Sequence, residues 1–202
     1  ESIMFGRYWL GTAHYLLNEL DEAEPYLKAI VDDPYAARPN YLVQGAFLLA
    51  LIYIKHGDDN KATDILNTVI SHTTETNDAV AHATGKAMQI ELKLMQGKVD
   101  EALKMDEQFI YGILPPMWFY YYDQLTKVKV RLAKNTTESL EEAIALLKPM
   151  EEILRKSNRK RILVDLLAIY ALVCDAQGKE QDAFEKIIES LNLAAAGGAV
   201  RN

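Results

Sequence analysis

The sequence has little of several things, and each shortage removes a class of protein. A single cysteine, Cys174, excludes an internal disulfide, and no uncharged apolar run is long enough to span a bilayer. Ten glycines and six prolines in 202 residues are too few for a collagen-like or disordered chain. Positive charge is also scarce, with 22 basic residues against 29 acidic ones, which is unsuited to gripping a phosphate backbone. We therefore expect a soluble, cytoplasmic chain that contacts neither nucleic acid nor membrane.

Apolar residues recur at helical spacing along most of the chain, and almost no window shows the alternation of a half-buried strand. Near the C-terminus, one apolar stripe runs from Leu163 to Cys174 and a second from Ala183 to Ala195. Between them lies Gly178, a residue suited to the left-handed position after a helix end. The pattern predicts a helical hairpin, with a first (A) helix and a second (B) helix.

This hairpin recurs through the chain. Its connecting turn carries Gly or Asn at the end of the A helix, acidic residues at the start of the B helix, and then an alanine. The alanines are 39, 40, 41 and 40 residues apart: Ala23, Ala62, Ala102, Ala143 and Ala183. A period of this size is typical of a solenoid, in which each hairpin buries its apolar face by stacking on its neighbours. The small alanine lets the B helix approach the A helix closely.

The repeat predicts an all-α fold, an α-solenoid of about five antiparallel helix hairpins that forms one domain over residues 1–202. We expect A helices near residues 3–17, 40–56, 77–96, 117–134 and 160–177, and B helices near 20–31, 59–74, 99–110, 138–156 and 180–196. The repeats are then approximately 1–36, 37–75, 76–114, 115–157 and 158–202. Because proline removes a hydrogen bond inside a helix, we expect a delayed start near Pro25 and a kink or break near Pro149.

The turn motif, with small residues at Gly11 and Ala50 of the A helices, resembles the tetratricopeptide repeat. Its period of about 40 residues is longer than the usual 34. It is similar to the stretched repeat in the regulatory solenoid of MalT-like, ATP-dependent regulators of the LuxR family. Segments that carry this resemblance in order are Leu10–Tyr15, Leu114–Met117, Val130–Ala133, Val164–Ile169 and Leu191–Arg201. The last resembles the family's Leu-Ala-x-Pro-Gly-Gly-x-x-Arg junction, with Ala196 in place of the proline.

The resemblance implies a right-handed superhelix that acts as the sensor of a bacterial transcriptional activator. In the family, this solenoid lies between a nucleotide-binding domain and a DNA-binding domain. The chain starts at Glu1 and has no Gly-x-x-x-x-Gly-Lys-Ser/Thr motif, so we expect a fragment of a larger protein. No cofactor is expected in this chain, and ATP is expected in the parent's missing domain. No nucleophile with a matching base is evident, so no enzyme activity is expected.

The aromatic run from Trp118 to Tyr122 is the most unusual local feature. Consecutive helical positions point about 100° apart, so five neighbouring rings cannot all be buried. Trp118, Tyr121 and Tyr122 are therefore candidates for a ligand-stacking platform or a partner anchor, and the alternative is core plus ordinary amphipathic tyrosines. Trp9 is a further candidate, since it or Tyr8 should face the inner side of the superhelix. Core or capping is the alternative there.

Three residues on the second and third A helices, Gln44, Phe47 and Glu91, fall at positions that line the concave surface of tetratricopeptide arrays. A polar group among apolar walls can orient a ligand. For Glu91, a solvated or paired carboxylate is the alternative. Lys127 and Lys129 could bring charge to the same groove, or could lie on solvated helix faces.

Other chemistry-bearing groups favour ordinary structural roles. The basic residues between Arg155 and Arg161 lack interleaved aromatics, so we expect a solvated edge or an interdomain contact. The four histidines have no metal-ligand spacing, and Cys174 is expected in the core.

Two functions remain open at this point. One is a regulatory solenoid that binds a small-molecule inducer, protein partners or the parent's other domains. The other is a tetratricopeptide scaffold that binds proteins and senses no small molecule. Peptide-carboxylate clamps need clustered Lys, Arg and Asn on the concave face, and this chain offers mainly aromatic and aliphatic residues there, which favours the first.

Overall fold

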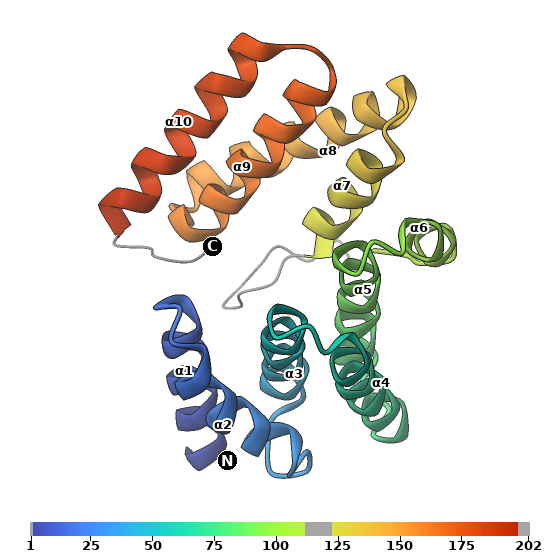
Figure 1. Ribbon diagram of the computed structural model, residues 1–202, viewed down its shortest axis with the longest axis vertical. Helices are drawn as coiled ribbons and strands as arrows, with labels where there is room; N and C mark the ends of the chain where they lie inside the picture. The colour runs from blue at the N-terminus through green and yellow to red at the C-terminus, as the bar shows by residue number, and fades with distance from the viewer. Residues whose placement is uncertain (1, 112–122, 198–202) are drawn as a thin grey trace.

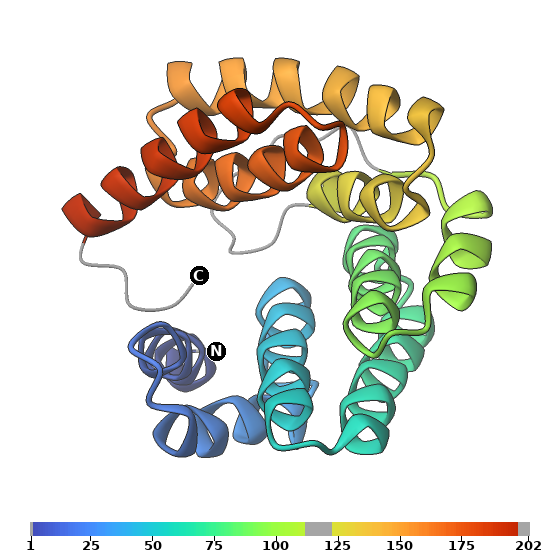
Figure 2. The same cartoon turned by 45° about the horizontal axis from the view of Figure 1, so that its top comes forward.

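The computed structural model describes residues 2–111 and 123–197, and these residues form an all-α solenoid. Five hairpins follow one another along the described chain. They curve so that the first and last repeats approach each other (Figures 1 and 2). The helices are α1 (Ser2–Leu16), α2 (Leu20–Val31), α3 (Pro39–Lys55), α4 (Asp59–Glu75), α5 (Ala79–Met95), α6 (Val99–Glu107), α7 (Asp123–Lys134), α8 (Thr137–Lys156), α9 (Lys160–Ala176) and α10 (Glu180–Gly197). The expected start of the fourth A helix at residue 117 lies outside the described residues.

The turns have the predicted chemistry. Gly57, Gly97 and Gly178 end A helices with φ of 79°, 72° and 71°, and Asn18 does the same with φ of 62°. A positive φ is accessible to glycine and tolerated by asparagine, whereas other side chains would be strained there. The fourth hairpin uses Asn135, with φ of 50°. Turn geometry is therefore set locally in every hairpin.

The recurring alanines are buried as the repeat predicts. Ala23, Ala62, Ala102 and Ala143 are fully buried and Ala183 nearly so. Glycine has the same role on the A helices: a Cβ added at Gly11 would lie 2.8 Å from the Leu27 side chain of α2. The A and B helices thus approach to a distance that larger side chains would not allow.

The expectation at the two prolines was wrong in part. Helix α2 begins at Leu20 without delay, and α8 runs unbroken through Pro149. Both prolines are exposed. Because proline has no N–H, Pro25 leaves the backbone carbonyl of Asp21 without its helical donor, and Pro149 does the same to Ala145. Asp21 and Ala145 are exposed as well. Water can satisfy a carbonyl on the solvent side, so neither helix has to end.

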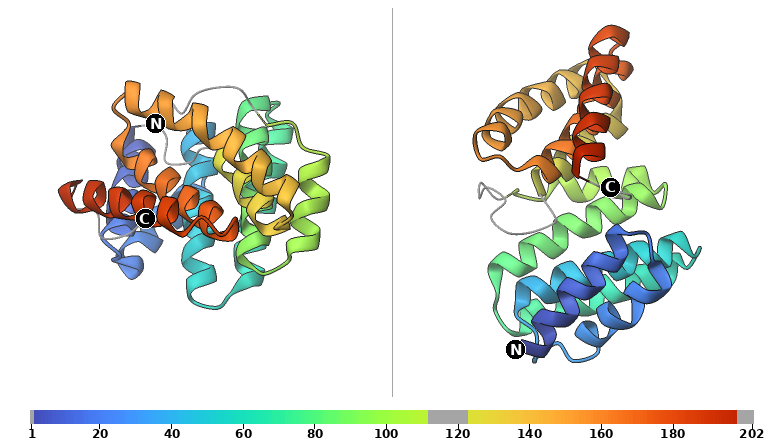
Figure 3. Two further views of the ribbon diagram at one scale, coloured as in Figure 1. Left: turned by 90° about the horizontal axis from the view of Figure 1, so that it is seen from above. Right: turned by 90° about the vertical axis from the view of Figure 1, so that its left-hand side faces the viewer.

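The apolar core is divided along the array. An N-terminal core joins α1 to α5 through side chains such as Tyr8, Leu27 and Leu49, and a C-terminal core joins α7 to α10 around Leu147 and Leu166. Between them lies a small central joint of buried Ile90, Ala102 and Val130, one residue each from α5, α6 and α7. Figure 3 shows α1–α4 at one end, α8–α10 at the other, and α5–α7 between them.

Cys174 lies in the C-terminal core, 3% exposed, as its stripe predicts. Burial raises the pKa of its thiol above the ordinary value of 9.0. A buried thiol of this kind is a poor nucleophile, in keeping with a packing role.

Candidate functional site

The A helices α1, α3, α5, α7 and α9 surround a cavity of about 680 Å³ on the inner side of the solenoid, which α6 also reaches. The volume falls in the range typical of small-molecule sites. The lining residues are Tyr15, Gln44, Phe47, Leu48, Leu51, Met88, Glu91, Leu94, Met95, Val99, Leu125, Lys129, Leu132, Ala133, Arg161, Asp165, Ala168 and Ile169.

One side of the cavity is apolar. Phe47, Leu48 and Leu51 of α3 and Met88 and Met95 of α5 form it. Helix α3 is apolar nearly all round because α1, α2, α4 and α5 pack against it, and its remaining surface lines the cavity. This side can bind the apolar part of a ligand by removing it from water.

Charge enters the cavity from α5 and α7. The Glu91 carboxylate accepts a hydrogen bond of 2.6 Å from the Thr126 hydroxyl and a contact of 2.5 Å from the Lys129 ammonium. Glu91 is only 8% exposed, so its charge needs these partners. Both of its oxygens are occupied.

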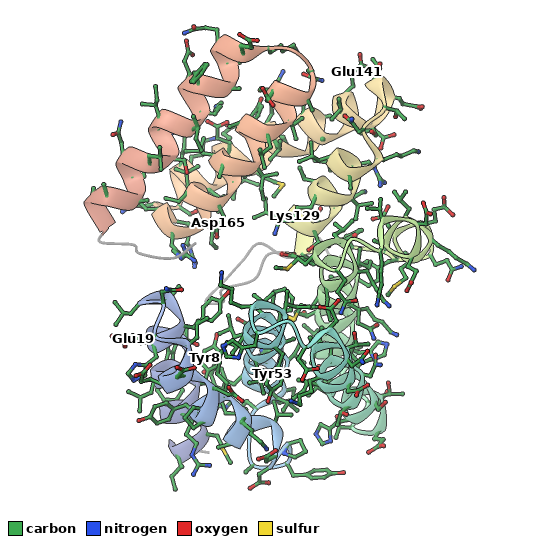
Figure 4. All side chains as sticks on the ribbon, viewed as in Figure 1. Tyr8, Glu19, Tyr53, Lys129, Glu141 and Asp165 are labelled. Atoms are coloured by element: carbon green, nitrogen blue, oxygen red, sulfur yellow. The ribbon has the colours of Figure 1, made fainter. Side chains whose placement is uncertain are left out.

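A second pair on α9, Arg161 and Asp165, faces the same space. Nη1 of Arg161 lies 3.8 Å from Oδ1 of Asp165, too far for a hydrogen bond. The Asp165 side chain is 29% exposed, and burial raises its pKa by more than the attraction of Arg161 and Lys129 lowers it. Figure 4 shows Asp165 and Lys129 pointing toward the space between the two halves of the molecule.

Gln44 of α3 lies at the α1 end of the cavity. Its Oε1 accepts a hydrogen bond of 3.0 Å from the hydroxyl of Tyr8, which is fully buried. This contact joins the first two A helices and fixes the orientation of the amide.

A separate polar cluster lies beside the central joint. Arg131 of α7 donates hydrogen bonds of 2.6 Å to Asp106 of α6 and to Glu142 of α8, and the Tyr111 hydroxyl donates one of 2.7 Å to Asp106. Burial, followed by this hydrogen bond, raises the pKa of Tyr111. Charged contacts therefore reinforce the array where its apolar core is thinnest.

The structure brings together three of the residues that the sequence selected. Gln44, Phe47 and Glu91 all line the cavity, and Glu91 is also paired, as its alternative predicted. Trp9 does not line it: its ring packs edge-on to Phe5 and Tyr8 and is 40% exposed. Trp118, Tyr121 and Tyr122 lie outside the described residues. Ligand binding by any of these residues stays a prediction.

Arg161 and Asp165 are cavity residues that the sequence analysis missed. For Arg161 we expected a solvated edge or an interdomain contact. A solvated edge does describe Arg155 and Lys156, which pair with exposed or half-buried glutamates. The available signal was the spacing of four residues between Arg161 and Asp165, within the long apolar stretch of the same helix. Lys129 was left open between the groove and solvent, and the structure places it in the cavity.

Within residues 2–111 and 123–197, no three metal-ligating side chains gather in one place. Across the same ranges, every helix is too short or too polar to cross a membrane.

The fold and its inner cavity define a tetratricopeptide-like helical repeat domain. The chain belongs to the MalT-like TPR region family, whose model matches residues 2–202.

Solved structures support the same architecture. A Podosopora anserina protein described as a putative kinesin light chain with nearly identical TPR-like repeats is 17% identical, with a TM-score of 0.53 over 96% of each chain. A point variant of that protein is 18% identical, with a TM-score of 0.54 over 98% of each chain. At this identity the likeness concerns the fold alone. No curated protein matches the chain.

Proposed function

We propose that this chain is the sensory solenoid of a bacterial MalT-like transcriptional activator of the LuxR family, and that its inner cavity binds a small-molecule inducer. The observation that carries the proposal is the position of the cavity. Apolar side chains of α3 and α5 and charged side chains of α7 and α9 line it. A ligand inside it therefore contacts helices of both the N-terminal core and the C-terminal core.

This position supplies a physical route for regulation. A ligand shifts a conformational equilibrium only by the difference in its affinity for the two states. A change in the curvature of the solenoid would alter the distance between α3 and α9, which lie in different cores, and would therefore open or close the cavity. A ligand that fits one curvature better by a few kcal/mol would change the population of the parent's active state substantially.

The proposal assigns the remaining activities to other parts of the parent. ATP binds to the parent's nucleotide-binding domain and DNA to its DNA-binding domain. This chain acts in the cytoplasm without catalysis. Its partners are the inducer, the neighbouring domains of the parent and any protein that binds the same conformational states of the solenoid. The acidic balance of the chain supports a separate DNA-binding segment.

A thermal-shift screen of small metabolites tests the proposal, because a ligand that binds the folded state raises its melting temperature. Ala168→Phe adds a ring inside the cavity, and Ala145→Phe adds the same ring on the exposed face of α8. A true ligand should stabilise the wild type and Ala145→Phe but lose its effect in Ala168→Phe.

Stabilisation that survives in Ala168→Phe would place the ligand elsewhere. A screen in which no small molecule stabilises the wild type would favour the alternative function, a scaffold for protein partners.

A further inference from the structure

The four charged side chains in the cavity are unequally paired. The Glu91 carboxylate accepts a hydrogen bond of 2.6 Å from Thr126 and one of 2.5 Å from Lys129, so each of its oxygens has a close donor. Asp165 has Arg161 only at 3.8 Å. The two carboxylates face the same space, but among the described residues Glu91 has close donors and Asp165 has no cation within hydrogen-bonding distance.

We propose that the cavity recognises an organic cation, an ammonium group carried on an apolar body, with the ammonium at the Asp165 carboxylate. This inference rests on the proposed function, since it names the chemical class of the inducer for that same cavity.

The existing contacts favour a cation over an anion. An anion at Lys129 would have to draw that ammonium from Glu91, and would leave a carboxylate that is only 8% exposed without its cation. An ammonium group at Asp165 adds a short charge-assisted hydrogen bond and breaks no contact within hydrogen-bonding distance. The raised pKa of Asp165 agrees with this, because burial penalises its charge more than the nearby cations stabilise it.

The rest of the cavity specifies the apolar body. Phe47, Leu48 and Leu51 lie on α3, across the central space from α9, the helix that carries Asp165 (Figure 1). Met88 and Met95 also line the cavity. An ammonium group at Asp165 therefore directs an attached chain or ring toward apolar side chains. Methionine side chains adapt to different shapes, so the head group is expected to be recognised more strictly than the body.

Three probes with the same chain and different heads test the proposal on the wild-type chain: octylammonium, octanoate and 1-octanol. Isothermal titration calorimetry at neutral pH should show octylammonium binding at least about tenfold more tightly than the other two, as a hydrogen bond to a charged group predicts. Octylammonium should also raise the melting temperature most. This comparison needs no variant, so it stands even if substitutions impair folding.

Asp165→Asn removes the charge and should weaken octylammonium binding about tenfold or more while leaving 1-octanol unchanged. Glu141→Gln is the matched control, because it also removes one negative charge but lies exposed on α8, away from the cavity (Figure 4). It should bind octylammonium as the wild type does.

The outcomes separate the two proposals. The proposal of an organic cation is refuted if octanoate or 1-octanol binds as tightly as octylammonium, or if Asp165→Asn binds octylammonium with full affinity. The cavity then remains a proposed ligand site. The same holds if no octyl probe binds but a screened metabolite does so in an Ala168-dependent way. If neither the probes nor any screened metabolite binds, both proposals fail.

Discussion

The two halves of the solenoid are held together by different means. In the N-terminal half, α1 to α5 pack closely at Gly11 and Gly85, where the side chain of a neighbouring helix leaves no room for a Cβ atom. Neutral hydrogen bonds such as that from Tyr8 to Gln44 also join helices there. In the C-terminal half, ion pairs join the helices: Arg155 of α8 contacts Glu189 of α10, and Lys186 of α10 contacts Glu151 of α8.

This difference continues into the cavity. The N-terminal half provides Phe47, Leu48 and Met88 with one charged side chain, Glu91. The C-terminal half provides the other three charged side chains, Lys129, Arg161 and Asp165, beside apolar residues of α7 and α9. An array of similar repeats has thus acquired two unlike inner surfaces. The contrast explains how a solenoid built from one repeated motif can hold an asymmetric site, with three of its four charged side chains on the helices of the C-terminal half.

The largest expected effect comes from removing core side chains in each half. Leu27→Ala and Leu147→Ala each create a cavity at a fully buried site and should each cost about 2–5 kcal/mol of unfolding free energy. Because the two cores are separate, hydrogen exchange should show Leu27→Ala lowering protection in α1–α4 and leaving α8–α10 protected. Equal loss throughout the molecule would show a single cooperative unit and remove the distinction between the halves.

Arg131→Gln tests the charged contacts beside the central joint. It leaves the Asp106 carboxylate, whose side chain is 4% exposed, without its cation, and should cost about 2–4 kcal/mol in urea unfolding. Arg155→Gln is the control, because the Arg155 side chain is 41% exposed and its pairs should be worth less than about 1 kcal/mol. Similar costs for both variants would contradict the view that burial sets their value.

Gly11→Ala tests the close packing of the N-terminal half. The added methyl group would meet Leu27 at 2.8 Å, so we expect a net loss of about 1–2 kcal/mol. Gly6→Ala on the same helix meets nothing within 4 Å and should gain about 0.5–1 kcal/mol from helix propensity. Thermal unfolding of the two variants should therefore move in opposite directions, and stabilisation by both would refute the tight approach of α1 and α2.

The smallest effect concerns Asp165 in the C-terminal half. Its folded-state pKa is raised above 3.8, so the folded chain binds this proton more tightly than the unfolded chain. Stability should therefore fall as pH rises from 3.8 through the raised pKa, and Asp165→Asn should abolish that part of the fall.

Above this pH window, Asp165→Asn should be slightly more stable than the wild type in urea unfolding. The exposed Glu141→Gln should leave the pH profile unchanged. A variant that loses stability at neutral pH would show that the pair with Arg161 is net stabilising.

Features that depend on local chemistry were predicted from the sequence. The turn residues, the buried alanines and the placement of Cys174 follow from spacing alone, and the repeat register placed Gln44, Phe47 and Glu91 on the inner surface. The tolerated prolines were not foreseen, because whether a lost hydrogen bond faces water depends on tertiary packing.

The pair of Arg161 and Asp165 illustrates the same limit. Its residues lie one turn apart at the start of α9, and only the opposing helices α3 and α5 turn that surface into a cavity wall. Lys127 and Lys129, two residues apart, were equivalent candidates in the sequence. The structure separates them: Lys127 lies over the Tyr111 ring and Lys129 contacts Glu91.

The buried Cys174 gives the molecule an intrinsic reporter. It is the chain's single cysteine, and it is buried in the C-terminal core on α9, the helix against which α10 packs. A thiol reagent can reach it only when the last hairpin opens, so the rate of labelling measures how often that hairpin separates from the array. Ligand-induced tightening of the solenoid could thus be followed in the unmodified protein by the slowing of a single chemical reaction.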